Sequence, residues 1–230
     1  MTQSIQQTLN RLRQGGIIAQ LPGDLSLPYS LSVADAMLAA PVLAVEVQMM
    51  GAESGTLITD LCRRADGNML VGVNGVETGE ALQTAVSAGA QFLSSPTFDL
   101  QMAQYCHNHQ VVYIPGVISI MAAQLAANAG SRLIRLRTGG DGGPAFVQHL
   151  QAAFPELGVL VAVIDDTDLT YAQAYARMGA VALLAGSSLF AGTHQSMAEM
   201  IANARQYRQA WETGRAEREQ SAFASRNGKV

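Results

Sequence analysis

Short apolar runs alternate with amphipathic segments along most of the 230-residue chain. The amphipathic segments space their apolar positions as helices do, which predicts helices at Ser32–Ala39, Thr56–Ala65, Glu80–Ser87 and Asp168–Met178. Alternating strands and helices predict a parallel sheet, and eight such units at this length predict a single closed (β/α)8 TIM barrel. The runs that predict its eight strands are Gly16–Leu21, Val42–Val47, Met69–Val73, Gln91–Ser95, Val111–Ile114, Leu133–Leu136, Gly158–Ile164 and Ala180–Ala185.

One short motif recurs where a helix-like segment meets the apolar run that follows it. Its three copies are Ala88-Gly89-Ala90, Ala129-Gly130-Ser131 and Met178-Gly179-Ala180. Glycine there suits the left-handed residue that ends many helices, so we expect each helix to turn directly into a strand. A capping box, with aspartate in place of glutamate, is expected from Ser32 to Asp35.

The two ends of the chain are polar. Residues 1–14 are amphipathic and contain no apolar signal core. Ser196–Gln220 is expected to form the last barrel helix and an extension of it, whose Trp211 either adds an interface or lies on the barrel. We expect residues 1–220 to form one barrel domain with its terminal helices, and residues 221–230 to form a flexible tail.

Net charge, the length of apolar runs and the cysteine and lysine content each argue against one kind of protein or site. The net charge is −4 and the arginines are scattered, so no basic patch for nucleic acid is expected. No apolar run is long enough for a membrane span. Cys62 and Cys106 lack metal-ligand spacing and are expected to be buried thiols of a cytoplasmic protein. The chain has a single lysine, Lys229, which excludes a lysine Schiff base inside the barrel unless the tail folds back.

The alternation of side chains along strands predicts a charged pair inside the barrel. Apolar Ile134 and Leu136 should face the helices, which turns Arg135 and Arg137 toward the lumen or its rim. By the same reasoning Glu46 faces inward. A buried glutamate and a buried arginine each cost several kcal/mol unless they are paired, so we predict an ion pair between Glu46 and Arg135 near the barrel axis. Such a pair either serves chemistry or merely fills the lumen.

Barrel enzymes place their chemistry at the carboxyl ends of the strands. Two glycine-rich segments there, residues 139–143 and 186–188, are able to aim backbone N–H groups at a phosphate or carboxylate, although glycines also make tight turns. The first segment precedes a helix that is expected to start near Pro144. The residues expected to bind an anion or substrate are Arg137, Gly142, Gly143, Gly186, Ser187, Pro115 and Gly116.

An acid pair, Asp165 and Asp166, follows the seventh apolar run. It is either a functional pair or a polar loop in which Thr167 or Asp168 caps the next helix. Together with Glu46 it would suit Mg²⁺ or Mn²⁺, but no spacing rule selects a metal, and no cofactor is expected. None of the four histidines, His107, His109, His149 and His194, lies at a strand end beside a carboxylate, so solvated or packing roles are expected.

The order of these motifs resembles the 2-keto-3-deoxy-6-phosphogluconate (KDPG) and 4-hydroxy-2-oxoglutarate (KHG) aldolases, class I enzymes on a (β/α)8 barrel, from about Gln14 to Phe190. Glu46, within Ala44–Val47, falls at the family's catalytic glutamate. The family's strand-four, strand-five, phosphate-loop and strand-eight segments resemble Gly89–Pro96, Ile114–Val117, Gly142-Gly143 and Gly186–Leu189. The resemblance implies a 2-oxo acid or sugar phosphate as substrate and a homo-oligomer, a trimer in the family.

The catalytic residues match less well than the fold. The family's Schiff-base lysine falls on Arg135, and a guanidinium stays protonated and is no nucleophile. The family's strand-two Thr-Leu-Arg reads Gln48-Met49-Met50 here, its strand-three Gly-Thr reads Asn74-Gly75, and its strand-seven Thr-Gly-Gly reads Ile164-Asp165-Asp166. The glutamate and the anion-binding frame are retained.

Three functions stay open on the sequence alone. The first is an aldolase-like lyase with altered or lost imine chemistry, in which Arg135 or Arg137 holds a 2-oxo acid, Glu46 moves protons and Asp165 or Asp166 recruits a metal. The second is a non-catalytic barrel that binds a phosphorylated or carboxylated metabolite. The third is a sugar-phosphate isomerase or epimerase with Glu46 and Asp165 as acid and base. The expected catalytic residues are therefore Glu46, Arg135 and Asp165.

Overall fold

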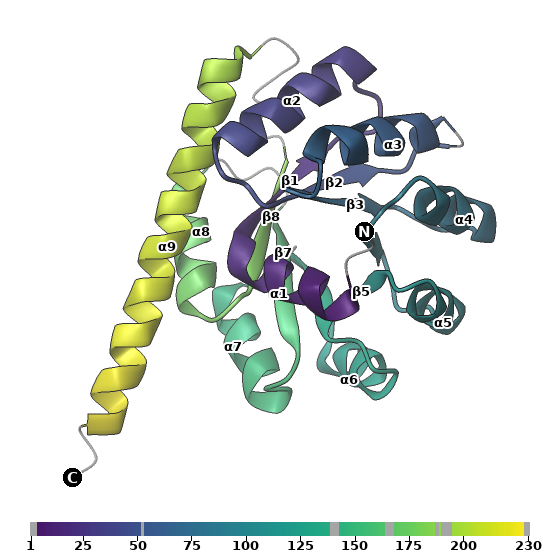
Figure 1. Cartoon of the computed structure of the whole chain (residues 1–230). Coiled ribbons are helices and arrows are strands. Elements are labelled where there is room, and N and C mark those ends of the chain that lie inside the picture. The colour runs from purple at the N-terminus through teal and green to yellow at the C-terminus, as the bar shows by residue number, and fades with distance from the viewer. Residues whose placement is uncertain are drawn as a thin grey trace.

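A computed structural model of the chain describes residues 4–51, 53–138, 143–163, 168–186, 189 and 195–227. Eight parallel strands pair in chain order, and the last pairs with the first to close a barrel surrounded by helices (Figure 1). The predicted (β/α)8 barrel is thus confirmed. The strands are β1 (Gly16–Leu21), β2 (Ala44–Gln48), β3 (Leu70–Asn74), β4 (Phe92–Ser95), β5 (Val112–Val117), β6 (Leu133–Thr138), β7 (Gly158–Val163) and β8 (Ala182–Ala185).

Helices follow the strands and cover the outside of the barrel. One further helix, α1, precedes β1 and lies across the end where the strands begin (Figure 1). The helices are α1 (Ile5–Gly15), α2 (Leu27–Ala39), α3 (Ser54–Ala65), α4 (Gly79–Ser87), α5 (Leu100–Asn108), α6 (Ile120–Asn128), α7 (Pro144–Ala153), α8 (Leu169–Arg177) and α9 (Met197–Asn227). Among these described helices, none is both long enough and apolar enough to cross a bilayer.

The strands divide their side chains between two apolar clusters. The inner cluster fills the lumen with side chains such as Ile18, Leu70 and Phe92, and Leu9 and Leu12 of α1 close its lower end. Burial of this apolar surface is the main stabilising term of a barrel core. The outer cluster lies between strands and helices and includes Ile134 and Leu136, which we expected to face the helices, as well as Val45 and Val47 on either side of Glu46.

The recurring glycine motif has the predicted conformation. Gly89, Gly130 and Gly179 have φ angles of 98°, 86° and 97°, in the left-handed region that favours glycine. In each copy the residue after the glycine donates its backbone N–H to a carbonyl five residues back, which satisfies the helix end and leads into the next strand. These bonds run from Ala90 to Ala85, from Ser131 to Ala126 and from Ala180 to Tyr175.

Two predicted boundaries are wrong. Helix α2 starts at Leu27, with Ser26 as its N-cap and Pro28 in its first turn, so Ser32 lies inside the helix and not in a capping box. The Ser32 hydroxyl instead donates to the carbonyl of Pro28. Strand β5 does not end before Pro115 but continues to Val117, because Pro115 and the glycine after it pair with β4 and β6.

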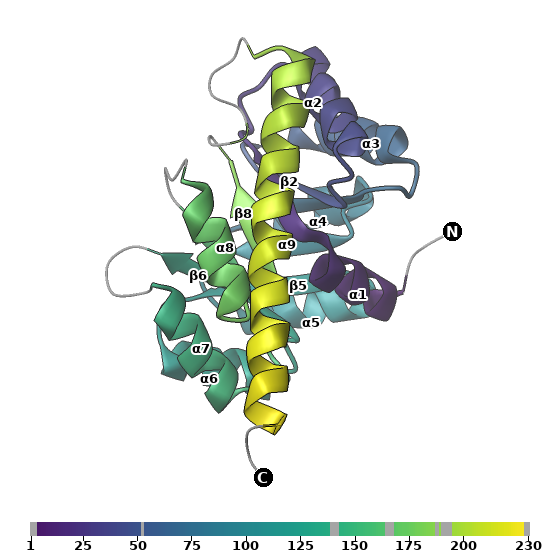
Figure 2. The same ribbon diagram turned by 90° about the vertical axis from the view of Figure 1, so that its left-hand side faces the viewer.

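Helix α9 is longer than expected and lies across the side of the barrel. It packs on α8, α2 and β1 (Figure 2). Trp211 is only 2% exposed and its ring lies against Gly16, so of the two alternatives for this side chain the structure supports packing on the barrel. The helix does not end near Gln220 but continues to Asn227, and residues 219–225 are exposed.

A glycine in β3 shapes the lumen. Gly72 pairs with Glu46 on one side and with Phe92 on the other, and a Cβ atom on it would lie 2.2 Å from the Phe92 ring. Glycine is therefore required here for the ring to pack across the strand.

We expect Gly72→Ala to lower the free energy of unfolding by about 1–3 kcal/mol, because an added methyl group overpacks a filled core. Urea denaturation followed by circular dichroism measures the loss. Gly79→Ala is the matched control, since no atom lies within 4 Å of a Cβ at that position. An unchanged stability of Gly72→Ala would show that Phe92 has room to move aside.

Candidate functional site

Four polar side chains form a hydrogen-bonded network in the half of the lumen nearest the carboxyl ends of the strands. They come from four different strands: Gln20 from β1, Glu46 from β2, Ser94 from β4 and Arg135 from β6. Each follows by two residues an apolar lumen residue of its own strand, so strand alternation turns all four inward. Those apolar residues are Ile18, Ala44, Phe92 and Leu133.

Glu46 is the centre of this network. The residue is 1% exposed, and both carboxylate oxygens accept hydrogen bonds. Oε1 accepts from Ser94 Oγ at 2.6 Å, while Oε2 accepts from Gln20 Nε2 at 3.0 Å and from Arg135 Nη1 at 3.1 Å. These partners offset the cost of removing the carboxylate from water.

The predicted ion pair between Glu46 and Arg135 is confirmed. The Arg135 side chain is 15% exposed, and its Nη1 also donates to Ser94 Oγ at 3.0 Å. Ser94 therefore donates to the glutamate and accepts from the arginine. Three residues from three strands thus fix one another in place inside the barrel.

Two buried donors near this network have no acceptor among the described residues. One is Nε of Arg135, and the other is Nδ2 of Asn74, whose residue is 8% exposed. Asn74 is the last residue of β3, and it shares the inward phase of Leu70 and Gly72. The mouth end of the lumen therefore contains two N–H groups that are still able to bind an acceptor.

The sequence did not single out Gln20 or Ser94. Both lie within apolar runs that we interpreted as strands. Both carry the same signal, which is a polar residue two positions after an apolar residue that faces the lumen. Gln20 follows Ile18 in this way, and Ser94 follows Phe92. Periodicity alone does not distinguish such a residue from the polar end of a strand.

The residues expected to bind an anion are only partly described. Arg137 is exposed at the end of β6, Gly143 is the N-cap of α7, which begins at Pro144 as predicted, and Gly186 follows β8 directly. The positions that lie outside the described residues are Gly142, Ser187, Ser188, Ile164, Asp165, Asp166 and His194.

A Cβ on Gly116 would lie 2.1 Å from the Pro96 carbonyl oxygen, so close backbone approach already requires glycine there.

Other predicted candidates have local structural roles. Asp168 caps α8 by accepting the backbone N–H of Thr170 at 2.9 Å. His109 ends α5 and stacks on Tyr105 with 4.2 Å between the ring centroids. In the part of the chain that the structure describes, no group of three or more His, Cys, Asp or Glu side chains is arranged to hold a metal.

The two cysteines are free thiols, and burial raises their pKa values. The pKa of Cys62 rises to about 11 and that of Cys106 to about 12. Because the thiolate is the reactive form, both side chains are poor nucleophiles at neutral pH. Cys106 is buried, as predicted, whereas Cys62 is only partly buried.

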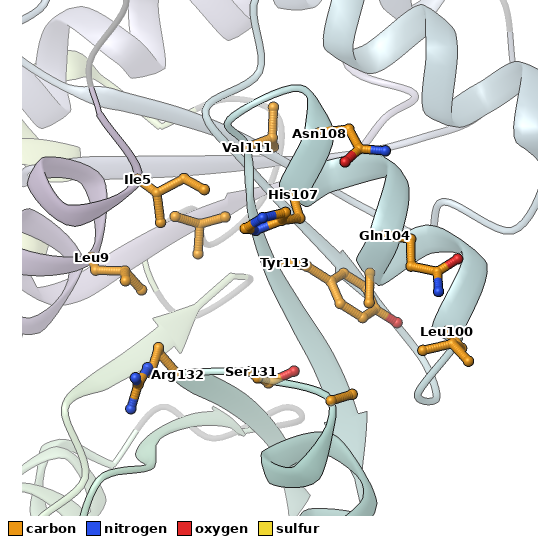
Figure 3. A pocket seen from close by; sticks show the side chains of 14 residues that line it. Ile5, Leu9, Leu100, Gln104, His107, Asn108, Val111, Tyr113, Ser131 and Arg132 are labelled. Carbon is orange, nitrogen blue, oxygen red and sulfur yellow. The ribbon is translucent and has the colours of Figure 1, made fainter.

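A groove of about 590 Å³ lies on the outside of the barrel (Figure 3). Leu100 and His107 of α5 line it together with Tyr113 of β5, and Ile5 of α1 lies at one end. None of its described lining residues belongs to the network around Glu46. The groove is therefore separate from the lumen site.

Comparison with known proteins finds a family model that matches most of this chain. The family model for "Aldolase: KDPG and KHG aldolase" matches residues 10–202. A 2-dehydro-3-deoxy-phosphogluconate aldolase of Treponema pallidum is 29% identical over 109 residues, which cover 46% of this chain and 50% of that protein. The chain spans between 50% and 58% of the length of the curated relatives it matches.

Solved structures share the fold at low sequence identity. The native KDPGal structure has a TM-score of 0.77 at 18% identity and covers 86% of this chain and 95% of its own. A KDPG aldolase from Legionella pneumophila, with pyruvate captured as a covalent carbinolamine intermediate, has a TM-score of 0.67 at 18% identity, with coverages of 90% and 95%. At these identities the similarity shows the barrel fold alone.

Proposed function

Because the chain belongs to the KDPG and KHG aldolase family, we propose that its barrel mouth holds a 2-oxo acid or the phosphate of one, and that it does so without forming a lysine imine. The observation that carries this proposal is the buried pair of Glu46 and Arg135. The pair occupies the positions at which the resemblance places the catalytic glutamate and the Schiff-base lysine. Arg135 also offers a carboxylate substrate its unpaired Nε–H, a charge-assisted hydrogen-bond donor.

An imine is not available to these residues. A carbinolamine, such as the one captured with pyruvate in the Legionella aldolase, forms when an amine adds to a carbonyl carbon. Arg135 is a guanidinium, and the single lysine, Lys229, follows the last described turn of α9. Residues 219–225 of that helix are exposed, and the helix runs past the edge of the barrel (Figure 2).

Carbon–carbon cleavage without an imine assigns separate tasks to the two charged side chains. The C4 hydroxyl of a 4-hydroxy-2-oxo acid loses its proton to a base, and the electron pair of the C3–C4 bond moves to the C2 carbonyl. The resulting pyruvate enolate then takes a proton at C3. Arg135 would stabilise the enolate charge, and Glu46 would move the protons once one of its hydrogen bonds opens. Asp165 is a candidate for a second acid or a metal ligand and lies outside the described residues.

Borohydride trapping tests the chemistry directly. With pyruvate and borohydride we expect no reduced adduct on any peptide of the barrel, because an imine is needed for trapping. Arg135→Lys keeps a cation beside Glu46 and adds an amine, so we expect a new adduct at residue 135 in that variant. An adduct on a barrel peptide of the wild-type protein would contradict the proposal.

Turnover is measured as pyruvate release from 2-keto-3-deoxy-6-phosphogluconate and from 4-hydroxy-2-oxoglutarate. Release without trapping is the expected result. If a chelator abolishes pyruvate release, a metal is the group that stabilises the enolate, and Asp165→Ala is the next variant to test. Insensitivity to the chelator would leave Arg135 as the group that stabilises the enolate.

Binding without catalysis is the second candidate function, and one observation favours it. Both oxygens of Glu46 already accept hydrogen bonds, and these bonds compete with its use as a base. A binding protein would be stabilised thermally by pyruvate, by an amount that grows as RT ln(1 + [L]/Kd), and would release no product. Turnover of either aldol substrate would exclude this candidate.

We further propose small molecules as ligands and a homo-oligomer as the assembly. Gly143 at the amino end of α7 supports an anion site, because the first turn of a helix leaves some N–H groups without a partner in the helix; Pro144 has none, and that of Phe146 donates to Gly143. Exposed apolar side chains on and before α6 support an interface between copies of the chain. They are Ile118, Met121 and Leu125.

A further inference from the structure

Two buried N–H donors without acceptors are unusual in one small region of a protein. More than nine in ten buried polar groups have a hydrogen-bond partner, so each exception calls for an explanation. Here the exceptions are Asn74 Nδ2 and Arg135 Nε, neither of which has a partner among the described residues. Both lie toward the mouth end of the lumen, where a ligand would enter.

The two residues that carry these donors lie on either side of Ser94. Val73 pairs with Leu93 in the sheet, so the next step of this register sets Asn74 beside Ser94. Arg135 reaches the serine from the other side, with Nη1 3.0 Å from Ser94 Oγ. Asn74 and Arg135 therefore face the same small volume of the lumen, from β3 and from β6.

The two unpaired donors, and not a net charge, decide what is able to bind in this volume. Glu46 and Arg135 neutralise each other, and Asn74 and Ser94 carry no charge. A ligand that uses both orphan donors needs two acceptor atoms close together. A monoanionic carboxylate with an adjacent oxo group offers such a pair, since its C1 and C2 oxygens lie side by side in one plane.

We propose that Asn74 is a substrate-positioning residue, whose Nδ2 binds one oxygen of a 2-oxo acid while Arg135 Nε binds a neighbouring oxygen. This inference rests on the proposed function and deepens it by naming the group that the donors receive, the carboxylate with its adjacent oxo oxygen. An unpaired amide in the free protein is then a cost that ligand binding removes. Sites prepared in this way commonly sacrifice stability for function.

Asn74→Leu tests the proposal with two independent measurements. Leucine has a similar size and no polar atoms, so we expect the ligand-free variant to melt at a higher temperature than the wild-type protein. Its affinity for pyruvate, measured from the thermal shift across a pyruvate titration, should fall about tenfold or more. Asn74→Asp keeps the shape of the side chain and replaces the donor with an acceptor, and it should lose pyruvate binding as well.

Asn68→Leu is the matched control. It makes the same substitution at an exposed residue that precedes β3, at the end of the strand opposite to Asn74. We expect its affinity for pyruvate to stay within about twofold of the wild-type value, as is usual for a surface substitution that removes no ligand contact.

The outcomes separate the two proposals. If pyruvate and 2-oxobutyrate both fail to stabilise the wild-type protein, the proposed function is wrong and this inference is overturned with it. If the wild-type protein and Asn74→Leu bind pyruvate equally well, only the role of Asn74 is overturned. A lower melting temperature of ligand-free Asn74→Leu would identify a structural amide and overturn the positioning role too.

Discussion

Replacing Arg135 with methionine is expected to lower the free energy of unfolding by about 3–5 kcal/mol, because it leaves a buried carboxylate without its counter-charge. Glu46 is almost completely buried and would keep only the neutral donors Gln20 and Ser94. Methionine matches the length of the arginine stem, so the loss reports the missing charge more than a missing volume. Urea denaturation at neutral pH measures it.

The double variant Glu46→Leu with Arg135→Met removes both charges and is expected to recover most of the lost stability. Arg64→Met is the surface control. Arg64 pairs with Asp35, and this bond lowers the pKa of that carboxyl, yet the pair is exposed and solvent screens it. A loss in Arg135→Met no larger than in this control would mean that water reaches Glu46 and replaces the arginine.

Trp211→Ala is expected to lower the free energy of unfolding by about 3–5 kcal/mol, as is usual when a buried tryptophan is truncated. Its ring covers the start of β1 at Gly16, where a Cβ atom would lie 2.4 Å from the ring. Loss of the ring leaves a cavity between α9 and the barrel. Chemical denaturation, followed by circular dichroism because the variant lacks the tryptophan signal, measures the change.

Phe223→Ala on the same helix is the control. Phe223 is 69% exposed, so the substitution is expected to change stability by less than about 0.5 kcal/mol. If Trp211→Ala were as mild as this control, α9 would not contribute to the stability of the barrel. Equal and large losses would instead point to a partner that covers the exposed end of α9.

The sequence predicted the barrel well because its signals are local and repeated. Apolar runs identified all eight strands, and glycine in the left-handed conformation marked three helix ends, as Gly89 shows. The start of α2 was missed because the Ser32 to Asp35 spacing imitates a capping box, whereas the helix begins five residues earlier at Leu27. The end of β5 was missed because Pro115 normally marks a turn, while here β4 continues to pair with it.

The candidate site was predictable only where a residue conflicted with its surroundings. A glutamate and an arginine inside apolar strands had to be paired, so Glu46 and Arg135 could be matched across 89 positions of sequence. Ser94 and Gln20 are neutral and tolerable at many positions, so nothing in the sequence required them to meet that pair. The unpaired amide of Asn74 depends on what its neighbours leave unsatisfied, and only the three-dimensional arrangement reveals that.

The closing contact between β1 and β8 has a consequence for synthesis of the protein. Strand β1 gains its second neighbouring strand only from β8, and Trp211 of α9 packs against its start. A nascent chain therefore displays one unpaired edge of β1 until β8 has left the ribosome, and unpaired edges promote aggregation. The N-terminal strand, although made first, is among the last parts of the barrel to be completed.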